Sequence, residues 1–242
     1  MTFSLSRRLS AEFTGTAFLV AAVVGSGIMA ERLSGGNLSL CLLENTLATG
    51  AALVALILAF GPVSGAHLNP AVSLAGGMAG ELPWAEVASY ISVQVLGAIA
   101  GVIVTHLMFT LPAIQASRRA RSGPAQFLSE CVATFGLLAV IAGCSRARPE
   151  ATAYAVGAYI TGAYWFTAST AFANPALTIA RSLSNTFAGI RPADVAPFIA
   201  AQLSGAFAAA IFFRWLIHVP KTQAAELRPA SELGSASEIE TQ

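Results

Sequence analysis

The chain has 242 residues, of which 55% are hydrophobic and 10% charged, and its formal net charge is +1 at pH 7. Soluble domains carry about 25% charged residues, so this composition, with a mean hydropathy of +0.68, excludes an ordinary soluble domain. The basic cluster Arg118–Arg121 is too short to indicate a partner nucleic acid, and we interpret it as a solvated loop.

Six uncharged runs follow one another along the chain, and we predict a transmembrane helix at each. Crossing the hydrocarbon takes roughly 20 residues, with about 17 as a minimum, and five of the runs are that long. The fourth run is too short, so we expect Glu130 to lie within the membrane at the start of its helix. The runs are 13–30, 46–66, 87–109, 131–145, 151–180 and 195–213.

One tripeptide occurs twice within these apolar stretches, as Asn69-Pro70-Ala71 and as Asn174-Pro175-Ala176. Proline suits the first position of a helix, and asparagine is among the best N-cap residues just before it. The pattern therefore predicts two half-helices, at about 69–79 and 174–185, that enter the membrane without crossing it. An N-cap asparagine keeps its NH₂ group as a donor, so two such donors together could hold a small polar molecule.

The two halves of the chain repeat each other beyond this tripeptide. Glu12 at the start of the first span matches Glu130 at the start of the fourth. Because each half has three spans, an odd number, the second half enters from the opposite side and the repeat is inverted. Such folds place their working site near the midplane. The third span and the sixth span also share a spacing of residues, Gln94, Gly97 and Gly101 against Gln202, Gly205 and Ala209.

We therefore predict one transmembrane domain over residues 1–221, with repeat halves at about 9–109 and 126–217. The segment 222–242 is polar and rich in Ala, Ser and Glu. We expect this tail to be disordered.

The run Ser64–Val72, the second Asn-Pro-Ala, the paired glutamates and the six-span layout resemble the major intrinsic proteins, the aquaporins and aquaglyceroporins. The resemblance covers about Leu9 to Leu216. It implies an all-α membrane protein, with six transmembrane helices and two re-entrant half-helices in an inverted repeat. It also implies a homotetramer with one pore per protomer in the inner (plasma) membrane, with both termini cytoplasmic. No enzymatic activity, cofactor or metal site is implied.

The resemblance also implies roles for three further residues. Glu12 and Glu130 are expected to hold the backbone of the re-entrant loops. His67 either lines the inner pore or has a structural role in its loop, and both readings stay open.

In the family that the chain resembles, selectivity is set at a constriction on the outer side of the paired asparagines. We locate its four positions in this chain by their spacing from each asparagine. They fall on Thr49, Gly162, Ala171 and Leu177. Leu177 stands where the family nearly always has Arg, so this ring has no aromatic wall and no fixed charge. For Arg181, one turn beyond Leu177, we prefer a place at the outer mouth over a role as a surrogate filter charge.

A wide filter suits small neutral solutes such as glycerol-like polyols, urea-like solutes, neutral metalloid acids such as arsenite, and water. The chain is similar to bacterial members associated with arsenic resistance, which also lack the filter arginine. Three alternatives stay open: a water-selective aquaporin, an ion-coupled secondary transporter that uses Glu12 or Glu130, and a structural membrane protein that forms junctions. An ionisable residue in a membrane is a functional hypothesis by default.

Overall fold

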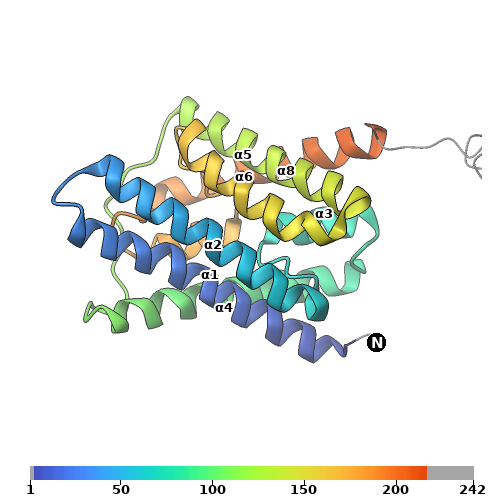
Figure 1. The fold of residues 1–242 in the computed structure, drawn as a ribbon, viewed down its shortest axis with the longest axis horizontal. Coiled ribbons are helices and arrows are strands. Elements are labelled where there is room, and N and C mark those ends of the chain that lie inside the picture. The colour runs from blue at the N-terminus through green and yellow to red at the C-terminus, as the bar shows by residue number, and fades with distance from the viewer. Residues whose placement is uncertain (1–2, 217–242) are drawn as a thin grey trace, which may run out of the picture.

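The computed structural model describes residues 3–216, and every regular element in that range is a helix. The predicted tail 222–242 lies outside these residues. Figure 1 shows the long helices side by side, with the start of α1 and the end of α8 at the same end of the bundle. The helices are α1 (Leu5–Leu33), α2 (Leu38–Ser64), α3 (Pro70–Ala79), α4 (Trp84–Met108), α5 (Pro124–Ala147), α6 (Thr152–Phe166), α7 (Pro175–Arg181) and α8 (Pro192–Leu216), with a 3-10 turn at Pro149–Ala151.

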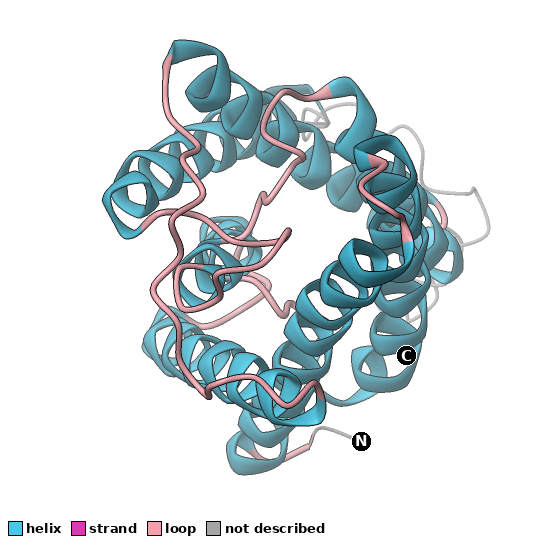
Figure 2. Ribbon diagram, turned by 90° about the vertical axis from the view of Figure 1, so that its left-hand side faces the viewer, coloured by secondary structure: helices cyan, strands magenta, loops and turns pink. Residues whose placement is uncertain are grey.

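Six of these helices are long, and α3 and α7 are the two short half-helices, so the predicted fold class is confirmed. Five of the long helices, α1, α2, α4, α5 and α8, are long and apolar enough to cross a membrane. The sixth, α6, has 15 residues, which at 1.5 Å per residue is about 22 Å and shorter than a typical hydrocarbon core. Figure 2 shows the long helices as a ring around loops that converge at its centre.

Helix α4 packs closely on α1, and α8 packs in the same way on α5. A Cβ atom added at Gly97 would collide with the backbone of Phe13, and one added at Gly205 would collide with the backbone of Cys131. Only glycine leaves room for backbones at this separation, which is the small-residue packing common between membrane helices. The spacing that the third and sixth spans share therefore places a glycine at an equivalent close contact in each half.

The second half-helix is shorter than predicted, because α7 ends at Arg181 and not near residue 185. The Leu183 amide donates to the Ala180 carbonyl at 3.0 Å, and the chain turns instead of continuing the helix. The residues that follow pair with the connection between the two halves. The Ser117 amide donates to the Ser182 carbonyl at 2.9 Å, and the Gln115 amide donates to the Leu183 carbonyl at 2.9 Å.

Candidate functional site

The two asparagines cap their own half-helices, as the sequence predicts. The Asn69 side-chain oxygen accepts from the Ala71 amide at 2.9 Å, and that of Asn174 accepts from the Ala176 amide at 3.0 Å. Each following proline occupies the first turn, where its missing N–H removes no helical bond. The local sequence is thus sufficient to start both half-helices at these points.

The side-chain amide of each asparagine also donates to a backbone carbonyl in the loop that precedes the other asparagine. Asn69 Nδ2 donates to the Ala173 carbonyl at 2.8 Å, and Asn174 Nδ2 donates to the Leu68 carbonyl at 2.8 Å. An amide NH₂ carries two hydrogens, so one hydrogen on each side joins the loops and the second remains. The sequence predicted free NH₂ donors at this place. In the structure, one N–H of each asparagine is used in the bond between the loops, and the other N–H remains.

Both loops have an unusual backbone just before the asparagines. Leu68 and Ala173 have φ values of 50° and 47°, in the left-handed region that residues with a Cβ atom rarely adopt. Ala66 and Ala171, each two residues earlier, are also left-handed, with φ of 45° in both cases. Such a conformation costs about 1–2 kcal/mol per residue, so both loops need support from their surroundings.

Glu12 supplies part of this support for the first loop. Its carboxylate accepts from the amides of His67, at 2.9 Å, and Leu68, at 2.7 Å. It also accepts from Ser64 Oγ at 2.7 Å and from Gln94 Nε2 at 2.8 Å. The side chain is 0% exposed, so these donors take the place of water.

Glu130 has the equivalent position in the second half. Its carboxylate accepts from the amides of Phe172, at 2.8 Å, and Ala173, at 2.9 Å, and from Gln202 Nε2 at 2.6 Å. Gln202 also donates to Thr178 Oγ1 at 2.9 Å, as Gln94 donates to Ser73 Oγ at 2.8 Å in the first half. The sequence repeat is therefore also a repeat of hydrogen bonds.

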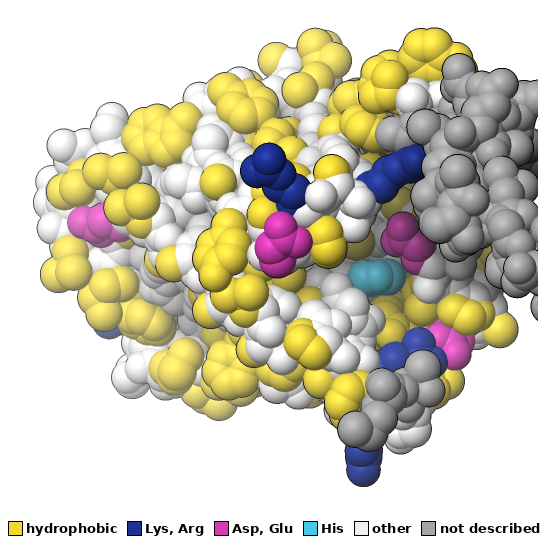
Figure 3. All heavy atoms as spheres, turned by 45° about the vertical axis from the view of Figure 1, so that its right-hand side comes forward, with side chains coloured by type: hydrophobic (Ala, Val, Ile, Leu, Met, Phe, Trp, Pro, Cys, Tyr) yellow, Lys and Arg dark blue, Asp and Glu magenta, His cyan; other side chains and the backbone are white. Residues whose placement is uncertain are grey.

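Both asparagines line a cavity of about 1670 Å³. His67 lines it on one side of them, with its Nδ1 atom 3.1 Å from Ser73 Oγ. Figure 3 shows a hollow in this face of the molecule, with a histidine side chain visible in it and charged side chains around it. Of the two Asn-Pro-Ala motifs, only the asparagines line the cavity. The other motif residues are buried away from it, namely Pro70, Ala71, Pro175 and Ala176.

Three of the four predicted filter residues, Thr49, Ala171 and Leu177, line this cavity, but Gly162 does not. Gly162 is exposed on the outer face of α6, and a Cβ atom added there would meet nothing within 4 Å. The cavity-facing residues of this helix are Thr152, Val156, Ile160 and Tyr164, which follow one another at four-residue intervals. A position two residues away is turned by about 200° around the helix axis, so the placement of Gly162 in the filter was wrong.

Two residues that the sequence analysis did not place in the filter line the cavity beside Thr49 and Leu177. They are Tyr164, whose hydroxyl oxygen is 3.3 Å from Thr49 Oγ1, and Arg181. Arg181 is only 2% exposed, so its side chain is buried in the cavity wall. The cavity wall here has an aromatic ring and a fixed charge, contrary to expectation. The four-residue spacing from Leu177 to Arg181 on one helix face was the available signal.

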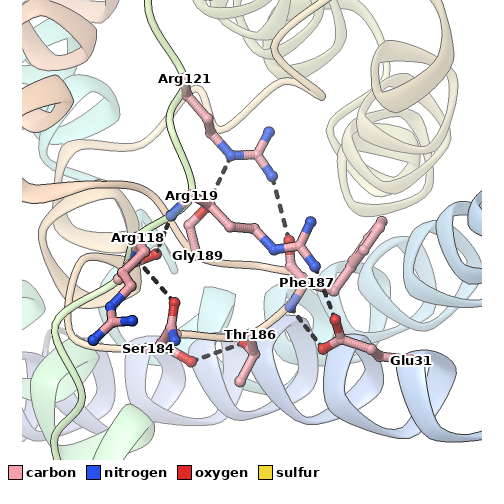
Figure 4. A network of polar contacts seen from close by, with 10 residues as sticks. Glu31, Arg118, Arg119, Arg121, Ser184, Thr186, Phe187 and Gly189 are labelled. Carbon is pink, nitrogen blue, oxygen red and sulfur yellow. Dashed lines mark hydrogen bonds and ion pairs between the residues drawn. The ribbon is translucent and has the colours of Figure 1, made fainter.

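The basic cluster between the halves is also more than a solvated loop. Figure 4 shows Arg119 and the backbone of Phe187 converging on Glu31. Arg119 Nη2 lies 2.8 Å from a Glu31 carboxylate oxygen, and the Phe187 amide donates to the other oxygen at 3.1 Å. Arg121 donates to the Gly189 carbonyl at 2.9 Å. These contacts fasten the connection between the halves to the segment that follows α7.

Comparison with known proteins gives matches over most of the chain. The family model described as Major intrinsic protein matches residues 1–153. The chain is 55% identical over 215 residues to Aquaglyceroporin AqpS of Rhizobium meliloti (strain 1021), covering 89% of this chain and 92% of that protein. It is 31% identical to Aquaporin NIP1-4 of Oryza sativa subsp. japonica, over 87% of this chain and 77% of that one. The aquaglyceroporin structure from Plasmodium falciparum shares the fold, with a TM-score of 0.66, 23% identity and coverage of 87% and 96%.

Proposed function

Because the chain belongs to the major intrinsic protein family, we propose that its cavity is a passive path for small uncharged solutes across the membrane. The chain is a multi-pass membrane protein with an aquaglyceroporin-like channel for small solutes, and its family consists of channels and not of enzymes. Beyond this family-level function, we propose which solutes pass and which residues contact them. The solutes are glycerol-like polyols, neutral metalloid acids such as arsenite, and water.

The observation that carries the proposal is the meeting of Asn69 and Asn174 in the cavity wall. Each asparagine has an N–H left after its bond to the opposite loop. A solute that leaves water would receive these two donors at the centre. Backbone acceptors on the lining segments 65–68 and 171–173 would replace its other water contacts. Nothing is consumed in such a passage, so the flux follows the solute gradient.

The two buried carboxylates favour a passive channel over an ion-coupled transporter. Neither Glu12 nor Glu130 lines the cavity, and both are 0% exposed. Each accepts two loop amides and a glutamine side chain. We therefore assign them to supporting the re-entrant loops, because binding a coupling ion would take these oxygens away from a strained backbone.

Further parts of the proposal concern assembly and placement. The proposed state is a homotetramer in the inner membrane with one pore per protomer and cytoplasmic termini. Exposed large apolar side chains on the outside of the bundle, such as Phe18, Leu96 and Phe207, suit contact with lipid or with neighbouring protomers.

A specific observation also favours a second candidate, a water-selective aquaporin. Tyr164 and Arg181 line the cavity beside Thr49, and both side chains take space that an open filter would leave to a larger solute. The relative named an aquaglyceroporin favours the wider solute range, which we retain.

The experiment that tests the proposal is stopped-flow light scattering on proteoliposomes loaded with the purified protein. Water, glycerol and arsenite are compared with empty liposomes of the same lipid. Flux of glycerol or arsenite above the empty vesicles supports the proposal. Water flux alone would instead establish the water-selective candidate, and no flux of any solute would overturn both.

A further inference from the structure

Four buried polar atoms occur as two equivalent pairs, one pair in each half of the chain. They are Thr16 Oγ1 and Gln94 Oε1 in the first half, and Thr134 Oγ1 and Gln202 Oε1 in the second. All four residues are 0% exposed, and none of these atoms has a hydrogen-bond partner among residues 3–216. Burying a polar atom without a partner costs free energy. Both halves carry this cost at the same place, so its cause is common to both.

Each threonine lies one helical turn beyond a glutamate that supports a re-entrant loop. Thr16 follows Glu12 by four residues, and Thr134 follows Glu130 by four. Residues four apart lie on the same face of a helix, so each threonine faces the same neighbouring helix as its glutamate. A buried helical threonine can donate to the carbonyl one turn earlier, as Thr105 does at 2.7 Å. Neither Thr16 nor Thr134 makes this bond, so both hydroxyls are available to another group.

Each glutamine is oriented by its NH₂ group. Gln94 Nε2 donates to Glu12 Oε2 and to Ser73 Oγ, both at 2.8 Å. Gln202 is held in the same way in the second half. These two bonds use both hydrogens of the NH₂ group and turn the side-chain oxygen away from the carboxylate. That oxygen can only accept, so its missing partner must be a donor.

Helices α1 and α4 run parallel to each other at this place. A Cβ atom added at Gly97 would meet the backbone of Phe13, and one added at Gly101 would meet the backbone of Ala17. A step of four residues along one helix therefore matches a step of four along the other. This register fixes which side chains lie across from each other.

Because Gln94 contacts Glu12, the residues one turn further on, Ala98 and Thr16, lie across from each other. Ala98 is 0% exposed, and its side chain ends at the Cβ atom. The side chain across from the threonine hydroxyl is thus a methyl group. In the second half Ala206 has the position of Ala98, four residues beyond its glutamine, and it is also buried.

We propose that one water molecule is bound in each half, between Gln94 Oε1 and Thr16 Oγ1 and between Gln202 Oε1 and Thr134 Oγ1. Water donates to the glutamine oxygen and exchanges a second hydrogen bond with the threonine hydroxyl. Buried waters typically bond to polar groups that the protein leaves unsatisfied. A cation would have no hydrogen to donate to the glutamine oxygen. The carboxylate nearby already accepts four donors in the first half.

Each bound water keeps its glutamine oriented with the NH₂ group toward the glutamate. The glutamate in turn holds the left-handed loop that precedes an Asn-Pro-Ala motif. The two waters are therefore part of the support of both re-entrant loops. This inference goes beyond the proposed solute path, and it does not depend on which solute crosses the membrane.

Thr16→Val and Thr134→Val test the inference by the sign of a stability change. Each replaces a hydroxyl with a methyl group and keeps the branched shape. With water bound, the apparent Tm in detergent should fall by about 2–4 °C, the shift for one net hydrogen bond in a chain of this length. A hydroxyl without any partner would give the opposite sign, because valine would remove an uncompensated burial cost. A Tm equal to or above that of the wild type in either variant would overturn the inference.

A double-mutant cycle tests whether the threonine and the glutamine share one molecule. Gln94→Met removes the glutamine oxygen, and residues that share a partner are coupled. Thr16→Val should therefore lower the Tm clearly less in the Gln94→Met background than in the wild type. Thr105→Val is the matched control, because its hydroxyl donates to the Gly101 carbonyl and its loss should be the same in both backgrounds. An equal effect of Thr16→Val in both backgrounds would contradict a shared water.

A crystal structure of the wild type at a resolution that orders buried water gives a test that needs no variant. A density peak is expected within hydrogen-bond distance of Gln94 Oε1 and Thr16 Oγ1, with an equivalent peak in the second half. Contacts of about 2.3–2.6 Å, typical of a bound cation, in place of about 2.8 Å would overturn the assignment to water. The lack of a peak in either half would do the same. None of these measurements depends on solute flux, so their outcome is separate from that of the channel proposal.

Discussion

Asn69 and Asn174 each donate a hydrogen bond to the carbonyl of the residue that precedes the other, Ala173 and Leu68 respectively, at 2.8 Å in both cases. Each asparagine also caps its own half-helix through its side-chain oxygen. One side chain therefore starts a helix, joins two halves of the chain and faces the cavity. Its substitution should affect stability and flux together, and suitable variants can separate the two effects.

Asn69→Ala should lower both the yield of folded channel and its flux. The change removes an N-cap, worth about 1 kcal/mol, and a hydrogen bond worth about another 1 kcal/mol. Asn69→Ser keeps a good cap and removes the amide donors, so it should restore part of the yield but not the flux. Asn37→Ala is the matched control, because Asn37 caps α2 at an exposed position away from the cavity. Wild-type flux of all solutes in both Asn69 variants would refute the donor role.

Glu12→Gln and Glu130→Gln should destabilise the protein without changing how flux responds to ion gradients. A glutamine offers one acceptor oxygen, and its NH₂ faces loop amides that are themselves donors. Leaving one such buried amide unpaired costs about 1–3 kcal/mol. Thermal unfolding in detergent measures the loss, and glycerol uptake with and without imposed proton or sodium gradients measures coupling. Gradient-driven accumulation in the wild type that either variant abolishes would establish a transporter instead.

Leu177→Arg combined with Thr49→Phe should reduce glycerol and arsenite flux much more than water flux. Both changes add volume to the cavity wall, and the new guanidinium would lie one turn from Arg181. Leu177→Met, a change of similar volume without charge, is the control and should leave the flux ratio near that of the wild type. A well-folded double variant with an unchanged ratio of solute to water permeability would show that the constriction lies elsewhere.

Gly162→Val and Gly97→Val should behave in opposite ways. Gly162 has open space around its Cα on the outer face of α6, so valine should be tolerated and should leave glycerol flux unchanged. Valine at Gly97 would meet the Phe13 backbone, and overpacking of this kind costs about 1–3 kcal/mol. Flux and unfolding temperature are measured for both. A Gly162→Val channel that folds but loses glycerol flux would return this position to the filter.

The parts of the site that local sequence dictates could be predicted from the sequence. An N-cap asparagine followed by proline starts a half-helix wherever it occurs, so both half-helices could be placed to within a residue at their starts. The end of α7 could not be predicted, because it depends on how the following segment pairs with the connection between the halves.

The filter positions could be predicted only in part, for a different reason. Counting backwards from Asn174 to α6 passes through a non-helical loop that contains the left-handed residues Thr170, Ala171 and Ala173. Spacing across such a loop does not preserve the rotation of a helix about its axis, so Gly162 was expected where Tyr164 lies. Likewise, the buried place of Arg181 depends on Ala188 and Phe172, which its own helix does not contain.

Glycerol equilibration in proteoliposomes of the wild-type protein tests the central claim most directly. Internal and external glycerol are measured over time, with and without a proton or sodium gradient across the membrane. A passive channel should bring internal glycerol to the external concentration faster than in empty vesicles, with the same end point under every gradient. Internal glycerol that rises above the external concentration under a gradient, or equilibration no faster than in empty vesicles, would contradict the account.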